Sequence, residues 1–182
     1  MSLIREIPPT AGLPILTKEV AQLIFKKPAP YLLEESLQEY LGAIHIRITY
    51  SGTAALYIIL ESLKEISEKR TVIIPSFICP LVPLAILRAG LKPAVCDISP
   101  KGFDFQKEKL EKIIRENNDV LAVIPTHLAG IPVNIKSYAT DCKNKGILII
   151  EDCAQSLGSK NEGIFTGTTA DFSFYSFCRG KM

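Results

Sequence analysis

The sequence lacks any apolar run long enough to cross a membrane. Stretches such as "LVPLAIL" fall far short of the roughly 20 residues that span a bilayer. The N-terminus, "MSLIREIPPT", carries charges and prolines in place of the apolar core of a signal peptide. We therefore expect a cytoplasmic chain with no membrane insertion.

An excess of charge of one sign is also missing. The 182 residues include 21 Lys and Arg against 19 Asp and Glu, a formal net charge of +2, and no basic cluster forms a nucleic-acid patch. None of the five cysteines is spaced from another as in a metal or redox site, and their number is odd. We interpret them as small buried apolar side chains and expect neither a metal nor a nucleic-acid partner. No G-x-G-x-x-G follows any expected strand, which weakens the case for a nicotinamide-dependent enzyme.

What the sequence does contain is an alternation of short β-branched runs with longer helical patterns. We expect strands at 44–48, 71–75, 92–98, 120–126, 147–152 and 170–176, and helices at 53–68, 79–89, 106–116 and 135–145. This order predicts an α/β fold with three layers, α/β/α, around a mostly parallel sheet. We expect residues 1–30 to form an N-terminal arm or helix and residues 31–182 to form one domain. Ligands in such folds bind at the carboxyl ends of the strands.

Two of the expected helices carry further detail. The helix at 53–68 is predicted to bury one face, consisting of Ala55, Ile58, Ile59, Ser62 and Leu63. The helix at 79–89 is followed by Gly90, which is typical of a cap in the left-handed backbone region.

The segment "YSGTAAL" places small residues at the start of a helix, directly after the first expected strand. Unpaired backbone N–H groups and the positive end of the helix dipole make such a start an anion site, best suited to phosphate. The alternative is ordinary N-capping by Ser51 or Thr53, with Gly52 easing the turn. The segment matches neither a P-loop nor a dinucleotide fingerprint.

The segment "IIEDCAQSLGS" brings two carboxylates to the end of a buried strand. Strand alternation sends Glu151 and Asp152 to opposite faces of the sheet. At this position Asp152 could bind a cation, orient a base or pair with a protonated ring nitrogen, and Gln155 could offer an amide to the same ligand. The alternative for Asp152 is capping of a following helix.

Near the C-terminus, Ser176, Arg179 and Lys181 could converge on an anion. A lysine that attacks carbonyls needs burial or a cationic neighbour to lower its pKa, and otherwise Lys181 is an ordinary solvated lysine. His127 follows a strand and precedes a glycine turn, so a site role and loop packing remain equally open. His45, within an expected strand, is interpreted as structural.

In order and spacing, these segments resemble the N-terminal half of the sugar-nucleotide aminotransferases, a family of fold-type-I enzymes that depend on pyridoxal 5′-phosphate. The resemblance covers roughly residues 30 to 181 and rests on "YSGTAALYIIL", "VIIPSFICPLVPLAILRAGLKPAVCDI", "VLAVIPTHLAGIP", "ILIIEDCAQSLGS" and "ADFSFYSFCRGK". It implies a truncated large domain of that fold. It also implies amino transfer, with glutamate as the expected donor and a keto-sugar nucleotide as acceptor, by a homodimeric enzyme of amino-sugar and polysaccharide biosynthesis.

The resemblance also assigns roles to individual residues. Gly52, Thr53 and Ser176 match the residues that hold the cofactor phosphate. Asp152 matches the carboxylate that keeps the pyridine nitrogen protonated, so that the ring can accept electrons from the substrate.

Two further positions match residues that act at the cofactor ring. Gln155 matches the residue beside the ring hydroxyl. Lys181 matches the lysine that forms the Schiff base and moves the substrate proton, whereas a dehydratase branch of the family has histidine there. A lysine therefore favours transamination.

The sequence departs from the family pattern at two points. Cys79 stands where an aromatic residue usually stacks on the pyridine ring, and Phe77 is nearby in sequence. Family members are also roughly twice as long, so we expect little turnover from this chain alone. The alternative function is a catalytically inactive α/β module that binds a phosphate-bearing ligand or a partner chain, which would have no use for Lys181.

Overall fold

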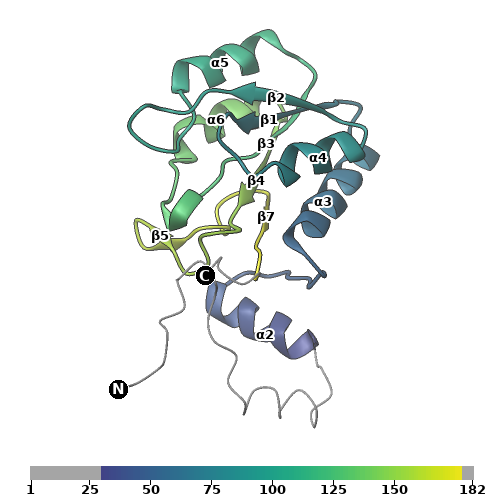
Figure 1. Cartoon of the computed structure of the whole chain (residues 1–182), viewed down its shortest axis with the longest axis vertical. Coiled ribbons are helices and arrows are strands. Elements are labelled where there is room, and N and C mark those ends of the chain that lie inside the picture. Colours follow the sequence, from purple (N-terminus) through teal and green to yellow (C-terminus); the bar gives the residue numbers. More distant parts are fainter. Residues whose placement is uncertain (1–29, 178–182) are drawn as a thin grey trace, which may run out of the picture.

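Five parallel strands form the central sheet of the protein, whose computed structural model describes residues 30–177 (Figure 1). The strand order is β2-β1-β3-β4-β7, and every neighbouring pair is parallel. The strands are β1 (Thr71–Pro75), β2 (Lys92–Cys96), β3 (Val120–Val123), β4 (Leu148–Asp152) and β7 (Phe172–Phe174). The predicted parallel α/β fold is confirmed.

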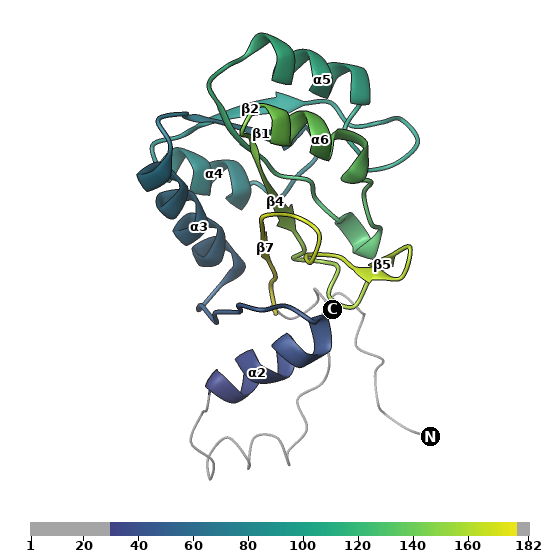
Figure 2. The same ribbon diagram turned by 180° about the vertical axis from the view of Figure 1, so that it is seen from behind.

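Helices cover both faces of this sheet (Figures 1 and 2). One face carries α3 (Gly52–Ile66) and α4 (Leu81–Arg88), and the other carries α5 (Lys107–Glu116) and α6 (Lys136–Asn144). These are the four helices that the sequence predicted, and their ends differ from the predicted ones by at most two residues. Gly90, directly after α4, has φ +72°, in agreement with the predicted left-handed cap.

Alternating side chains of the strands divide the interior into two cores. Val72, Ile124 and Ile150 pack under α3 and α4, whereas Val123 and Ile149 pack under α5 and α6. Because successive strand residues point to opposite faces, this division also fixes the directions of the residues just beyond the strand ends. A register shift between β1 and β3 near Val72 precedes the part of β3 that leads to the site.

Three local elements differ from the sequence prediction. Residues 44–48 form no strand, although their alternating apolar pattern favours one, and His45 is exposed there and is not part of a strand. Two elements were not predicted from the sequence: α2 (Pro30–Leu41) and the small antiparallel hairpin of β5 (Lys160–Asn161) and β6 (Ile164–Phe165). The expected arm at residues 1–30 falls almost entirely outside the described residues.

The predicted inner face of α3 was partly wrong. Leu63 is buried and Ala55 and Ile59 are half-buried, as expected, but Ile58 and Ser62 are exposed. The fully buried stripe is Leu56, Leu60 and Leu63. The stripe is therefore rotated from the predicted one by part of a turn.

Within residues 30–177, no helix is both long and apolar enough to span a membrane.

Candidate functional site

The candidate site lies at the carboxyl ends of β3, β4 and β7, on the face covered by α3 and α4. Asp152, the last residue of β4, is the register partner of Phe174, whose side chain lies in the core under α3 and α4. Register partners point to the same face of a sheet, so the Asp152 side chain is directed to this face as well. The predicted separation of Asp152 from Glu151 is thereby confirmed.

The N-terminus of α3 approaches the end of β7 closely. A side-chain carbon added to Gly52 would lie 3.0 Å from the carbonyl oxygen of Tyr175 and 3.2 Å from Cβ of Ser176. Only glycine allows the two backbones to come this close without displacing one of them. Two candidate phosphate-binding residues, 124 positions apart in sequence, are thus adjacent in space.

Ser51 caps α3, since its hydroxyl accepts a hydrogen bond from the Ala54 N–H at 3.1 Å. This is the N-cap that the sequence analysis held open as an alternative. The cap uses the N–H of Ala54, so the N–H groups of Gly52 and Thr53 in the first turn of the helix remain available. Both residues are half-buried, as is Ser176. The capped start and an anion site are therefore compatible.

Asp152 is buried, with 3 % of its surface exposed. Its Oδ1 accepts a hydrogen bond from the Ala154 N–H at 3.0 Å, which stabilises a turn, and no helix follows β4. The predicted alternative of helix capping by Asp152 is therefore wrong. The carboxylate instead stands at the strand end, on the side of Gly52 and Ser176.

A residue that the sequence analysis passed over, Thr126, stands beside Asp152. The two residues form an isolated parallel bridge just beyond β3. Thr126 is 5 % exposed, and its hydroxyl has no hydrogen-bond partner in the described part of the chain. A buried polar atom of this kind indicates a missing partner.

Gln155 joins the loops that follow β3 and β4. Its Oε1 accepts a hydrogen bond from the Ala129 N–H at 3.0 Å, and Ala129 has φ +51°, a backbone conformation uncommon outside glycine. The oxygen of the Gln155 amide is thus engaged, and its amide nitrogen is the group that remains to meet a ligand.

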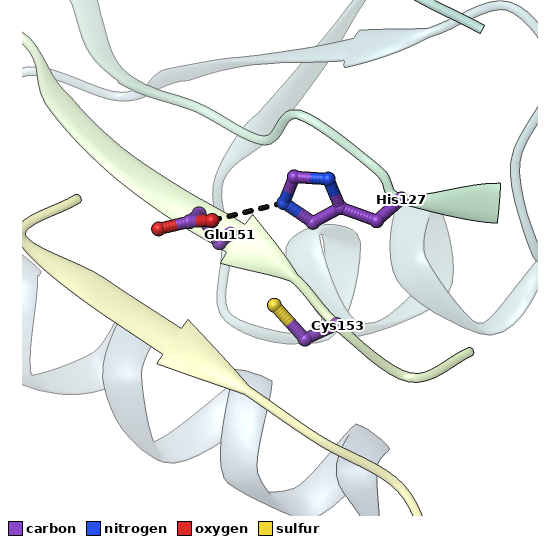
Figure 3. Close-up of side chains that lie close together, drawn as sticks. All are labelled: His127, Glu151 and Cys153. Carbon is purple, nitrogen blue, oxygen red and sulfur yellow. Dashed lines mark hydrogen bonds and ion pairs between the residues drawn. The ribbon is translucent and has the colours of Figure 1, made fainter. Parts of the chain in front are cut away.

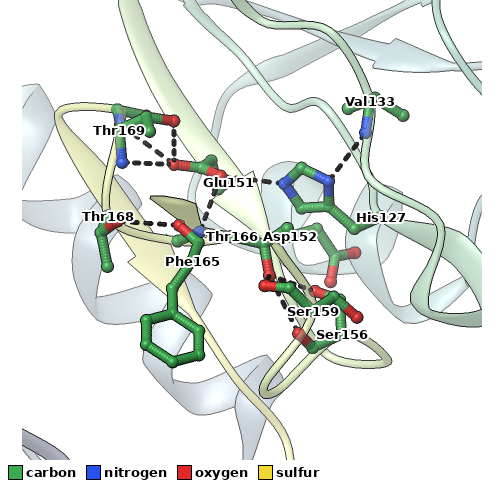
Figure 4. Close-up of polar contacts among 12 residues, drawn as sticks. His127, Val133, Glu151, Asp152, Ser156, Ser159, Phe165, Thr166, Thr168 and Thr169 are labelled. Atoms are coloured by element: carbon green, nitrogen blue, oxygen red, sulfur yellow. Dashed lines mark hydrogen bonds and ion pairs between the residues drawn. The ribbon is translucent and has the colours of Figure 1, made fainter. Parts of the chain in front are cut away.

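The opposite face of the sheet carries a closed polar network around Glu151 (Figure 4). The Glu151 carboxylate accepts backbone hydrogen bonds from Gly167 at 2.7 Å, from Thr169 at 3.0 Å and from Ala170 at 3.0 Å. It also accepts from the Thr169 hydroxyl at 3.0 Å and lies 2.9 Å from Nε2 of His127. Glu151 thereby fixes the loop that leads into β7.

The tautomer of His127 follows from its second contact. Nδ1 accepts the Val133 N–H at 3.1 Å, so the ring proton lies on Nε2 and is donated to Glu151. Burial alone would raise the pKa of Glu151, but the hydrogen bonds from His127, Gly167 and Thr169 outweigh it and hold the pKa below its usual value. Of the two roles left open for His127, the geometry supports loop packing.

His127, Glu151 and Cys153 place their ligand atoms within 4.8 Å of one another, as in a metal site (Figure 3). Both ring nitrogens of His127 and both oxygens of Glu151 are already in hydrogen bonds. Burial raises the pKa of the Cys153 thiol, which keeps it protonated. The cluster is therefore a hydrogen-bonded part of the core.

Cys79 and Phe77 lie in different environments. Cys79 is half-buried and packs on the core under α3 and α4, the face of Asp152. Phe77 is 62 % exposed, and its ring stacks on Phe103, which packs against the core of the opposite face. Phe77 therefore does not take the place of a stacking aromatic on the face of Asp152.

The remaining predicted site residues, Arg179 and Lys181, lie outside the described residues. Of those that are described, Gly52, Thr53, Ser176 and Asp152 lie on one face of the sheet. Cys79 packs on the core of the same face, and Gln155 lies in the loop that follows β4. This arrangement fits a phosphate with an aromatic ring, since the helix start at Gly52 lies on the same face of the sheet as a buried carboxylate and an unpaired hydroxyl.

Comparison with known proteins gives the site a context. The model of the DegT/DnrJ/EryC1/StrS aminotransferase family matches residues 21–182. A GDP-perosamine synthase from Vibrio cholerae is 29% identical over 81% of this chain and 40% of the relative. A UDP-N-acetyl-3-dehydro-alpha-D-glucosamine 3-aminotransferase from Acidithiobacillus ferrooxidans is 30% identical over 82% of this chain and 40% of the relative.

Solved structures agree with these matches. A putative sugar aminotransferase from Streptococcus pneumoniae, in its PLP form, superposes with a TM-score of 0.85 at 25% identity, over 95% of this chain and 49% of that one. PseC from Helicobacter pylori, an aminotransferase of pseudoaminic acid biosynthesis, gives a TM-score of 0.83 at 26% identity, over 93% and 47%. This chain thus spans less than half the length of these relatives.

Proposed function

Because the chain belongs to the DegT/DnrJ/EryC1/StrS aminotransferase family, whose members depend on pyridoxal phosphate, we propose that it is the cofactor-binding portion of a sugar-nucleotide aminotransferase. The acceptor is a keto-sugar nucleotide and the amino donor is glutamate, in a homodimeric enzyme of amino-sugar biosynthesis. The observation that carries the proposal is the close approach of Gly52 to Ser176 on the face that holds Asp152.

The roles proposed for these residues are those that the family resemblance implies, and the positions of the described ones support them. The first N–H groups of α3, with the Thr53 and Ser176 hydroxyls, bind the phosphate at the positive end of the helix dipole. Buried Asp152 holds a proton on the ring nitrogen, and the Gln155 amide donates to the ring hydroxyl. Cys79 would lie beside the ring, at the position where family members usually have a stacking aromatic residue.

Pyridoxal phosphate, when bound, supplies an aldehyde that reacts with amines and a ring that accepts electrons. Lys181 is the amine proposed to react with that aldehyde and to move the proton between the carbon atoms involved in amino transfer. Asp152 would keep the ring nitrogen protonated while Lys181 moves that proton.

The proposal is tested by adding pyridoxal phosphate to the chain, reducing with borohydride and mapping the labelled peptide. We expect the label on Lys181 and a visible absorption band before reduction. Lys181→Ala should abolish the label, whereas Lys160→Ala, which changes another lysine outside the site, should keep it. A folded chain that takes no label would overturn the enzyme assignment for this chain and favour the non-catalytic binding module.

A further inference from the structure

None of the binding roles proposed above involves the buried hydroxyl of Thr126. Thr126 is 5 % exposed, yet its Oγ1 has no hydrogen-bond partner among residues 30–177. Tyr138 is the other buried side chain of the described region with an unpaired polar atom, and it lies in the core under α5 and α6, away from the site. An unpaired buried hydroxyl lowers stability unless a ligand or water completes it.

The side chain of Thr126 faces the candidate site. The Asp152 N–H donates to the Pro125 carbonyl at 2.9 Å and the His127 N–H donates to the Asp152 carbonyl at 3.0 Å, which is a parallel bridge centred on Thr126 and Asp152. Bridge partners point to the same face. Ile124, two residues earlier, packs in the core under α3 and α4, which agrees with that direction.

The order of the strands then relates Thr126 to the atoms of the cofactor. β4 lies between β3 and β7, so Asp152 lies between Thr126 on one side and Ser176 on the other. In pyridoxal phosphate, the carbon that carries the phosphate arm and the carbon that carries the ring oxygen lie on opposite sides of the axis through the ring nitrogen. With the nitrogen at Asp152 and the phosphate on the side of Ser176, the ring oxygen faces β3.

We propose that Thr126 is a further binding residue of this site and that its hydroxyl donates a hydrogen bond to the 3-oxygen of the bound pyridoxal ring. This inference rests on the proposed function. Gln155 is compatible with it, because its Oε1 is held by the Ala129 N–H and only its amide nitrogen can donate to the same oxygen. Thr126 and Gln155 would then hold the ring oxygen from two different loops.

The experiment compares Thr126→Val, which keeps the shape and removes the hydroxyl, with Thr126→Ser, which keeps the hydroxyl. The probe is pyridoxamine 5′-phosphate, because it has the phosphate, ring nitrogen and ring oxygen but no aldehyde, so its binding needs no bond to Lys181. Its analogue without the 3-oxygen is the second probe. Thermal unfolding of the ligand-free chain is the second readout.

Thr126→Val should raise the unfolding midpoint of the ligand-free chain, since it removes an unpaired buried hydroxyl. The same variant should bind pyridoxamine phosphate about 3- to 10-fold more weakly, the range expected for one lost hydrogen bond. The affinity of Thr126→Ser for pyridoxamine phosphate should be closer to that of the unmodified chain. The analogue without the 3-oxygen should bind the unmodified chain and the valine variant equally.

Several outcomes would overturn the inference while leaving the proposed function intact. Equal affinities of the valine variant and the unmodified chain for pyridoxamine phosphate would do so. A lower unfolding midpoint for the valine variant would do so too, since the hydroxyl would then already have a partner within the chain. If the unmodified chain binds no pyridoxamine phosphate, the inference and the proposed cofactor site fail together.

Discussion

Glu151 and Asp152 are neighbours in sequence and both carry a carboxylate, but on the two faces of the sheet these carboxylates have different surroundings. Around Glu151, every carboxylate contact is supplied by the chain itself, from His127 and from the loop that enters β7. Around Asp152, the chain places a helix start at Gly52 and an unpaired hydroxyl at Thr126. The first face is closed by internal hydrogen bonds, and the second presents groups that a ligand can complete.

The difference shows how one strand end serves two purposes. Buried polar groups stabilise a fold only when their hydrogen bonds are complete, as they are for Glu151. A ligand site requires the opposite arrangement, in which donors are positioned and await a partner. By fixing the loop from Gly167 to Ala170, Glu151 also fixes the start of β7, and therefore the position of Ser176 beside Gly52.

The largest effect is expected from removing the centre of the closed face. Glu151→Ala leaves the buried ring N–H of His127 and the part-buried backbone N–H groups of Gly167 and Thr169 without an acceptor, at about 1–3 kcal/mol for each group that water cannot reach. We expect the free energy of unfolding to fall by at least about 3 kcal/mol, measured by urea denaturation. A loss below about 1 kcal/mol would contradict the closed network.

Gly52→Ala tests the open face and should have the next largest effect. The added carbon would lie 3.0 Å from the Tyr175 carbonyl, so the start of α3 or the backbone at Tyr175 must give by a few tenths of an ångström, at about 1–3 kcal/mol of overpacking. Binding of pyridoxamine phosphate should also be lost, as measured by titration. Gly102→Ala is the matched control, since an added carbon there meets nothing within 4 Å, and an equal effect of both variants would refute the close approach.

The lowered pKa of Glu151 predicts a pH dependence of the closed face. A carboxyl group whose folded pKa lies below its unfolded pKa stabilises the fold above the unfolded value, and this contribution disappears as pH falls through the folded pKa. The stability difference between the unmodified chain and Glu151→Gln should therefore shrink between neutral pH and about pH 3, in urea titrations at each pH. A difference that stays constant across this range would show that the charge of Glu151 contributes nothing.

The smallest effect is expected from an exposed ion pair. Lys136 and Glu162 join α6 to the hairpin of β5 and β6, with side chains 65% and 70% exposed. Solvent screens such a pair, so Lys136→Ala should leave the urea midpoint unchanged within error. A clear decrease would show that the hairpin, and not Glu151 alone, holds the loop before β7.

The sequence by itself determined the alternation of strands and helices, because apolar periodicity and glycine caps act within a few residues. It also determined that Glu151 and Asp152 point to opposite faces, since that follows from the geometry of any strand. The resemblance of its motifs pointed to the family. The phosphate-binding roles of Gly52, Thr53 and Ser176 remain a prediction, although Gly52 and Ser176 do lie close together in the fold.

The tertiary structure decided what depends on distant neighbours. The pattern at 44–48 favours a strand, yet in the described structure no neighbouring strand pairs with it, and the buried stripe of α3 is set by the sheet beneath it. His127 and Glu151 are 24 residues apart, so their contact follows from β3 lying beside β4. The unpaired state of Thr126 depends on everything that packs around it, because a hydroxyl is satisfied or left open by groups that only the folded chain brings near.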